Sequence, residues 1–238
     1  MAPTYAPVGR QVVSDAIHAR LRQDILEGRL GPGEALPAER ALSEAFGVNR
    51  HAVREALKRL QAERLVHVAQ GGATRVRPWR AEGGLDQLVA LGGLPGAARR
   101  HDLQRAAVEM RHCLGVDAAR LCARRAPTAL RRELPGAVPD APAASRADGR
   151  HAYAALWDRI IEGSGNIAYR LAYNSLLAAQ AQGGVAVEVH DAEVDDLAGQ
   201  RALVAAIAAS DEAAAADRAA ALLGHSLAAV GDGTAEAA

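Results

Sequence analysis

The stretch that decides the fold is ALPAERALSEAFGVNRHAVREALKRL, residues 35–60. Apolar residues recur at helical spacing on both sides of Gly47-Val48-Asn49, which predicts two helices joined by a tight turn. Pro37 is placed to open the first helix. Asn49 is placed to cap the second, because an Asn side chain can accept a hydrogen bond from a free backbone N–H at a helix start. Basic residues gather on the second helix, which raises the question of whether it reads DNA.

The flanking segments add a helix on one side and a hairpin on the other. Residues 12–26 carry apolar side chains at helical spacing, and a run rich in Gly and Pro stops that helix after Leu26. Residues 65–68 and 74–76 predict two short strands joined by a glycine turn. Helix, helix, turn, helix and hairpin is the order of a winged helix-turn-helix, which we predict for residues 1–80.

The second helix of the quoted stretch has one apolar face, so the residues near its N-terminal end point outward. That end of a recognition helix enters the major groove, where Arg can donate two hydrogen bonds to guanine and Asn or His can reach base edges or phosphates. A solvated helix face is the alternative, but the turn before this helix and the wing after it favour DNA binding. The outward residues are Asn49, Arg50, His51 and Arg54.

Two further groups are candidates for contacts with the DNA backbone. Gly71, Gly72 and Arg75, which we place at the tip of the wing, would lie over phosphates or the minor groove, although an ordinary hairpin turn explains them as well. Arg40 would reach the phosphate backbone, or it would form a surface ion pair with Glu39 or Glu44.

The charges divide along the chain, although 28 Lys and Arg balance 28 Asp and Glu overall. Residues 1–80 carry 13 basic and 8 acidic side chains, whereas residues 81–238 carry 15 and 20. A length of 238 residues also suggests two domains. The basic front part suits nucleic acid, and the acidic remainder suggests a different task.

Composition and periodicity predict that the remainder is helical, because Ala and Leu dominate and aromatic residues are few. We expect a linker at 81–84, an all-helical bundle of about six to seven helices at 85–231 and a disordered tail at 232–238. A loop is expected at 134–149. The expected helices are about 85–94, 99–125, 127–135, 149–163, 165–181, 190–209 and 211–230.

Cys113 and Cys122 are the only cysteines, and we interpret both as small core residues. No signal-peptide pattern and no apolar run of about 18 residues is present, so a protein of the reducing cytoplasm is expected, with no membrane partner. Catalysis is not expected, and we assign no catalytic residue, because Asp195-Asp196 and Asp211-Glu212 are adjacent rather than facing pairs.

The run LGPGEALPAERALSEAFGVNRHAVREALKRLQAERLV resembles the GntR family of bacterial transcription regulators, over about residues 10–77. The resemblance implies that Arg40, Arg50, Arg54 and the wing at Gly71 contact operator DNA, and that residues 51 and 52 vary with the operator. An all-helical C-terminal domain resembles the FadR subfamily, since the chain is too short for an aminotransferase-like domain and lacks the strands of a mixed-sheet domain.

One branch of that subfamily binds a metal ion through an Asp and a His four residues apart and two further His residues. Aligned on Ser164-Gly165-Asn166, these four positions hold Tyr153, Trp157, Gln200 and His225 in this chain. Only His225 matches. We therefore expect no metal and no other cofactor, and we expect the lone His225 to be a hydrogen-bonded core residue.

Without a metal, the chain is most similar to the fatty-acid regulators of the subfamily, which bind long-chain acyl-CoA. The resemblance lies in GGATRVRPWRAEGGLDQLVAL, ALWDRIIEGSGNIAYRLAYNSLL and LLGHSLAAV, and in Arg111 of VEMRHCLG. Donors for the polar end of the ligand would be Arg111, His225 and the Gly224 backbone. Alternatively, the aromatic residues are plain core, and Arg111 pairs with Glu109 or a neighbouring helix. The apolar walls would be Tyr153, Trp157, Tyr169, Tyr173 and Leu176.

The sequence thus predicts a homodimeric transcription regulator that binds two operator half-sites about one DNA turn apart and is controlled by a ligand in its helical domain. A regulator of fatty acid metabolism, a repressor or an activator, that senses long-chain acyl-CoA or a related lipid metabolite is the leading interpretation. One alternative is a regulator of carboxylate or sugar-acid metabolism that senses a small organic acid. The other is an architectural DNA binder without a ligand, whose bundle would contain no cavity.

Overall fold

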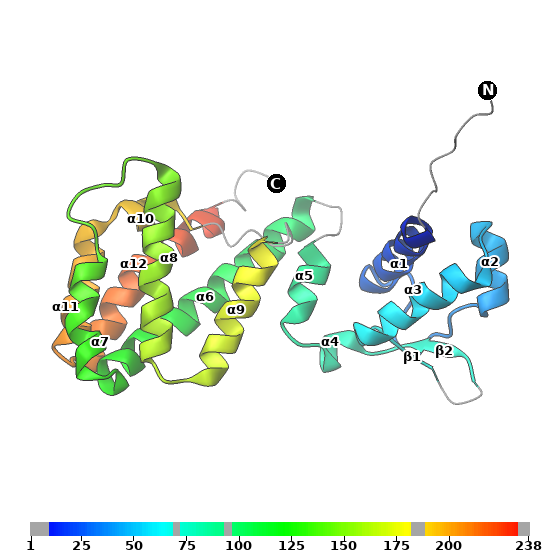
Figure 1. The fold of residues 1–238 in the computed structure, drawn as a ribbon, viewed down its shortest axis with the longest axis horizontal. Coiled ribbons are helices and arrows are strands. Elements are labelled where there is room, and N and C mark those ends of the chain that lie inside the picture. Colours follow the sequence, from blue (N-terminus) through cyan, green and yellow to red (C-terminus); the bar gives the residue numbers. More distant parts are fainter. Residues whose placement is uncertain (1–9, 69–71, 93–96, 182–188, 233–238) are drawn as a thin grey trace, which may run out of the picture. The chain divides into compact units, whose positions relative to one another are not determined.

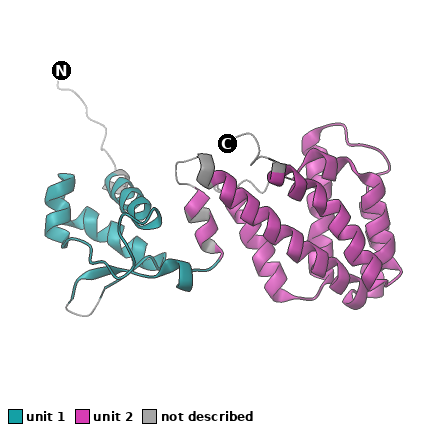
Figure 2. Ribbon diagram, turned by 180° about the vertical axis from the view of Figure 1, so that it is seen from behind, with its two compact units in different colours: residues 1–84 teal, residues 85–238 magenta. Residues whose placement is uncertain are grey.

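The computed structural model describes residues 10–68, 72–92, 97–181 and 189–232. The chain forms two compact units, residues 1–84 and residues 85–238 (Figure 2). Among the described residues, two short strands are the only sheet and helices make up the other regular elements (Figure 1). The predicted mainly helical fold is therefore confirmed.

The first unit has the predicted order of a winged helix-turn-helix. Its two strands pair antiparallel, with Val66 opposite Val76 and Val68 opposite Thr74. The unit ends in one helical turn at a place where the sequence analysis expected a linker to begin. The elements are α1 (Arg10–Leu26), α2 (Glu39–Phe46), α3 (Arg50–Ala62), β1 (Val66–Val68), β2 (Thr74–Val76) and α4 (Trp79–Glu82).

The turn between α2 and α3 is built as the sequence predicted. Gly47 ends α2 in the left-handed conformation, with φ of 64°, which a residue without Cβ adopts at little cost. Asn49 then caps α3, since its Oδ1 accepts a hydrogen bond from the backbone N–H of Ala52 at 2.9 Å. Behind the turn, α3 packs against α1. The two helices share a core whose largest buried members include Ile17, Leu21, Ile25, Val53 and Leu60.

The second unit is an all-helical bundle in which α6 and α12 pack along each other and α8 and α11 complete the core. Figure 1 shows that the consecutive helices α8 and α9 run in opposite directions and that both lie beside α6. The elements are α5 (Asp86–Gly92), α6 (Ala97–Arg125), α7 (Thr128–Glu133), the 3₁₀-helix η1 (Leu134–Ala137), α8 (Arg146–Gly163), α9 (Ile167–Ala181), α10 (Asp191–Asp195), α11 (Leu197–Ala208) and α12 (Glu212–Asp232).

Two helix starts in this unit differ from the prediction, both because a side chain caps the helix. α8 begins at Arg146 rather than about 149, since Ser145 Oγ accepts a hydrogen bond from the backbone N–H of Asp148 at 3.1 Å. The helix predicted over 190–209 is interrupted at Asp196, whose Oδ1 accepts from the backbone N–H of Gly199 at 2.7 Å and starts α11. α10 and α11 are therefore separate helices.

None of the helices in the described part of the chain is long and apolar enough to cross a membrane.

Candidate nucleic-acid interface and effector pocket

The N-terminal end of α3 presents the predicted DNA-reading residues on one exposed surface. On the outer face of α3, Arg50, His51 and Arg54 are exposed. On its inner face, Val53 and Ala56 have no exposed surface. The Asn49 cap fixes the first turn of the helix, so the backbone that carries these side chains is held in place. The arrangement has the geometry of a recognition helix: a rigid end, flexible basic side chains and an apolar back.

Arg54 is held by a carboxylate of the preceding helix. Its Nη2 lies 2.9 Å from Oε2 of Glu39, and its Nε lies 3.3 Å from both carboxylate oxygens. The hydrogen bond from Arg54 lowers the pKa of Glu39, and the same bond raises the pKa of Arg54. More than half of the Arg54 side chain is exposed, so a DNA base or phosphate can compete with Glu39 for the guanidinium.

Arg40 forms the surface ion pair with Glu44 that the sequence analysis gave as the alternative to a DNA contact. Its Nε lies 2.9 Å from Oε1 of Glu44, one turn along α2, and both side chains are largely exposed. Arg50, by contrast, makes no ion pair with any residue in the described ranges. Arg50 is thus the basic side chain on this surface that would bind phosphate or a base without first giving up a carboxylate.

Arg75 is not at the tip of the wing, which corrects its expected position. It lies in the middle of β2, opposite His67, and its Nη1 donates to the carbonyl oxygen of Gly33 at 2.9 Å. Arg75 also forms a bridge with Ala35, so it ties the loop before α2 to the wing. β2 begins at Thr74, so the turn between the strands comes before Arg75 in the chain. Gly72 is exposed beside that turn, and Gly71 lies outside the described residues.

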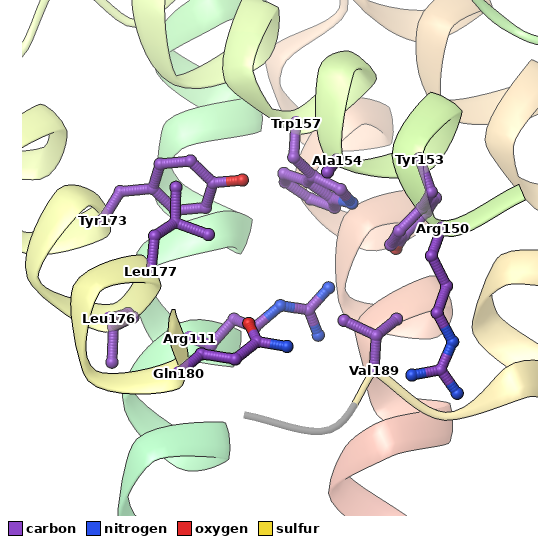
Figure 3. Close-up of a pocket in the computed structure, with 10 residues that line it drawn as sticks. All are labelled: Arg111, Arg150, Tyr153, Ala154, Trp157, Tyr173, Leu176, Leu177, Gln180 and Val189. Carbon is purple, nitrogen blue, oxygen red and sulfur yellow. The ribbon is translucent and has the colours of Figure 1, made fainter. Parts of the chain in front are cut away.

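The helical unit contains a pocket of about 110 Å³ that is lined by residues of α6, α8 and α9 and by Val189 (Figure 3). Four of the predicted effector-binding residues line it, together with the predicted apolar wall Leu176. Figure 3 shows the Trp157 ring and the Arg111 side chain on opposite sides of the space. The four are Arg111, Tyr153, Trp157 and Tyr173.

A buried acidic residue organises one wall of this pocket. Glu193 on α10 has no exposed surface, and Arg111 donates to it through both terminal nitrogens, with Nη1 at 3.1 Å from Oε2. The hydroxyls of Tyr153 and Ser226 donate to the same carboxylate. Gln200 of α11 contacts α10, since its Nε2 donates to the carbonyl oxygen of Val194 at 2.8 Å. The carboxylate thus has three side-chain donors, which a buried charge requires.

The pKa shifts follow from this network. Burial by itself lowers the pKa of Arg111, but the hydrogen bonds and negative charge of Glu193 outweigh it and raise the pKa. Burial and the nearby Glu193 carboxylate raise the pKa of Tyr153 well above 10. Arg111 therefore stays charged and Tyr153 stays a neutral donor at any physiological pH.

Glu193 is the member of this hydrogen-bond network that the sequence analysis missed. Arg111 pairs with the neighbouring helix α10 rather than with Glu109. The acidic run at residues 191–196 has the composition of a solvated helix surface, and two of its neighbours, Asp191 and Asp195, are indeed exposed in ion pairs with arginines. Nothing in the spacing of that run distinguishes Glu193 from them.

Three predicted effector residues do not line the pocket. The Tyr169 hydroxyl lies 2.7 Å from Asp117 of α6 and bonds there instead. His225 is 42% exposed and lies 3.7 Å from Asp196, so it is not the core residue we expected. Successive side chains of a helix point about 100° apart around its axis. The residue after His225 on α12, Ser226, therefore points in a different direction, and its hydroxyl donates to Glu193. Gly224 is likewise absent from the lining.

The described residues offer no group of three metal-ligating side chains. Of the four positions aligned with metal ligands, Tyr153, Trp157 and Gln200 are buried, while His225 is turned away. Tyr, Trp and Gln side chains are poor ligands for the metals that a His-rich site binds. The residues present therefore do not fit a metal site of that type.

The two cysteines differ from each other. Cys122 is buried, as expected, and burial raises the pKa of its thiol to about 11. Cys113 is exposed, which corrects the expectation that both are core residues. A thiol with so high a pKa is almost entirely protonated at neutral pH, so Cys122 is not suited to redox sensing.

A second cavity of about 470 Å³ lies on the other side of Tyr153. Its lining comes from the loop before α8, the first turns of α8, and the adjoining ends of α10 and α11. Tyr153 lines both cavities, and its hydroxyl donates to Glu193. Representative lining residues are Pro142, Ser145, Gly149, Val194 and Leu197.

The chain matches one family model and is similar to several known proteins. The family model "Bacterial regulatory proteins, gntR family" matches residues 13–76. The HTH-type transcriptional regulator Mce2R of Mycobacterium tuberculosis is 38% identical over 179 residues, which cover 73% of this chain and 72% of that protein. The Mannosyl-D-glycerate transport/metabolism system repressor MngR of Escherichia coli is 37% identical over 86 residues, 36% of this chain and 34% of the repressor. Among solved structures, E. coli McbR/YncC matches with a TM-score of 0.42 and 17% identity, covering 93% of this chain and 98% of that one.

Proposed function

The chain belongs to the GntR family of bacterial transcription regulators, and we propose that its binding to operator DNA is controlled by a compact effector in the pocket of the helical unit. DNA-binding transcription regulation is the function of the family. The observation that supports a DNA-reading role for this chain's own residues is the Asn49-capped end of α3, which presents Arg50, His51 and Arg54 to solvent.

We propose that the active form is a homodimer. Two recognition helices related by a two-fold axis would bind two half-sites about one DNA turn, roughly 34–36 Å, apart. The half-sites would form a pseudo-palindrome, and Arg40 would add a phosphate contact on each copy. An effector that changes the spacing between the two helices would change the affinity for such an operator. A coupling of about 1–3 kcal/mol is enough for a regulatory response.

The size of the pocket favours a compact effector over the long-chain acyl-CoA suggested by the sequence resemblance. Cavities that bury drug-sized ligands have about 300–1,000 Å³, whereas the pocket between Arg111 and Trp157 has about 110 Å³. A long acyl chain would have to join this pocket to the second cavity. Tyr153 lines both cavities, and moving it to open a path between them would remove one of the donors from a buried carboxylate.

The existence of a pocket beside a buried ion pair also argues against a purely architectural DNA binder. Such a protein gains nothing from the cavity, because close packing of the same bundle would be more stable. We propose further that neither the fold nor the effector site needs a metal or another cofactor, since the residues at the aligned positions do not fit one.

The test is a titration of operator affinity. Operator DNA is selected from a random pool by the full-length protein, and its dissociation constant is measured by fluorescence anisotropy with compact ketones, alcohols and carboxylates, and with palmitoyl-CoA. We expect at least one compact compound to change the dissociation constant by about fivefold or more. A shift produced by palmitoyl-CoA alone would overturn the compact effector in favour of the acyl-CoA sensor. DNA without the selected sequence is the control.

A further inference from the structure

We infer that the pocket recognises an uncharged molecule, through a ligand oxygen that accepts a hydrogen bond from Nε1 of Trp157. The inference rests on the proposed effector function and specifies the chemical class of the effector. Two features of the pocket carry it: the charges around the pocket are already balanced, and one buried donor has no acceptor.

Both cations that line the pocket are paired with carboxylates of α10. Arg111 donates to Glu193 through two nitrogens, and Arg150 Nη2 lies 2.9 Å from Oδ1 of Asp191. A ligand carboxylate could bind Arg111 only by displacing Glu193. Because Glu193 has no exposed surface, the displaced charge would have no water to receive it. The buried part of the pocket therefore has no free positive charge for an acid, and Arg150, at its exposed part, is paired with Asp191.

Trp157 supplies the unsatisfied donor. Its side chain is 4% exposed, and Nε1 has no hydrogen-bond partner among the residues that the structure describes. Tyr153 meets the Trp157 ring edge to face with ring centroids 6.3 Å apart. The Tyr153 hydroxyl donates to Glu193, and its oxygen does not meet Nε1 of Trp157 at hydrogen-bonding geometry. A buried N–H without an acceptor is unfavourable, and a ligand oxygen would satisfy it.

The rest of the pocket suits a small apolar body. Figure 3 shows Leu177 and Val189 on opposite sides of the space, and the Tyr173 hydroxyl directed toward the Trp157 ring. The volume admits a compact ring or a branched chain rather than a long one. Together these features describe a small ketone, ester or alcohol whose oxygen lies at Trp157 and whose carbon skeleton lies against the aliphatic walls.

The first experiment uses tryptophan fluorescence, because Trp79 and Trp157 are the only tryptophans. In the full-length Trp79→Phe variant, all tryptophan emission comes from the pocket. Cyclohexanone, methylcyclohexane and cyclohexanecarboxylate are titrated in turn, so that ring size is matched while the acceptor and the charge are varied. We expect cyclohexanone to change the emission saturably and to bind about tenfold more tightly than either of the others.

The second experiment removes the donor from the protein. Trp157→Phe keeps an aromatic ring but has no N–H, and calorimetry should show cyclohexanone binding about tenfold more weakly than it binds wild type. Trp79→Phe is the matched control and should bind like wild type, while circular dichroism confirms that both variants are folded. The comparison of cyclohexanone with methylcyclohexane on unmodified protein gives the same information without a mutation.

Three results would overturn the inference: tighter binding of the carboxylate than of the ketone, equal binding of the ketone and methylcyclohexane, or no binding of the ketone at all. Failure of the proposed function gives a different result. If cyclohexanone binds through Trp157 while operator affinity stays constant, the pocket chemistry is supported and the coupling to DNA is not.

Discussion

The two units of this protein use their ion pairs in opposite ways. In the first unit, Arg40 and Arg54 pair with carboxylates of α2 on an exposed surface. In the second, Arg111 pairs with a glutamate that has no contact with solvent. The arginine of an exposed pair can exchange its carboxylate for a phosphate at little cost in free energy. Opening a buried pair instead leaves an unpaired charge in the protein interior. The first arrangement suits a surface that binds and releases DNA, and the second suits a fixed wall of a pocket.

The largest difference between the two arrangements should be seen in stability. Replacing Arg111 by Met removes the cation and leaves the Glu193 carboxylate buried with two hydroxyl donors. We expect the free energy of unfolding of the helical unit to fall by about 3–5 kcal/mol, measured by urea denaturation followed by circular dichroism. Arg40→Ala, which opens an exposed pair, is the matched control and should change stability by no more than about 1 kcal/mol. Equal effects of the two substitutions would remove the contrast between the units.

The next effect concerns DNA alone. Arg50→Ala and Arg54→Ala should each weaken binding to the selected operator by roughly tenfold or more, because each removes a donor from the end of α3. Arg159→Ala, an exposed arginine on α8 in the helical unit, is the control and should leave the affinity unchanged. Thermal unfolding should be the same for all three variants. Unchanged operator binding in both α3 variants would show that a different surface reads the DNA.

A smaller effect is expected from the cap of the recognition helix. Asn49→Ala leaves the backbone N–H of Ala52 without its acceptor, so the unfolding free energy of the first unit should fall by about 1 kcal/mol. Asn174→Ala on the exposed face of α9 is a matched change without a cap, and we expect it to be neutral. If the two variants were equally stable, the cap would be incidental to the rigidity that we assign to α3.

The sequence predicted those features of the fold that a few neighbouring residues determine. The Gly47 turn, the Asn49 cap and the glycine-linked strands are each specified by a few consecutive residues, and the winged unit follows from their order. Helical periodicity also placed most of the bundle. One pocket is lined by Arg111, Tyr153, Trp157 and Tyr173, which lie at fixed positions on long helices.

What could not be predicted depends on contacts between distant segments. Glu193 meets Arg111 from 82 residues away, and its burial comes from the way α10 is held by Gln200 and α12. A shift of one residue on α12 decides whether His225 or Ser226 faces the carboxylate, and sequence periodicity does not resolve such a shift. The predicted starts of α8 and α11 were wrong for a different reason. Ser145 and Asp196 cap these helices, but each lies in a segment where several polar residues could have served as the cap.

The central claim is that the pocket of the helical unit controls DNA binding by the first unit. It is tested most directly by placing a bulky side chain in the pocket and measuring operator affinity. Ala154 and its neighbour Ala155 are both exposed on α8, but only Ala154 lines the pocket. We predict that Ala154→Trp changes the operator dissociation constant by about fivefold or more, in the same direction as a bound effector, and that Ala155→Trp leaves it unchanged. Identical operator affinity in wild type and both folded variants would contradict the claim.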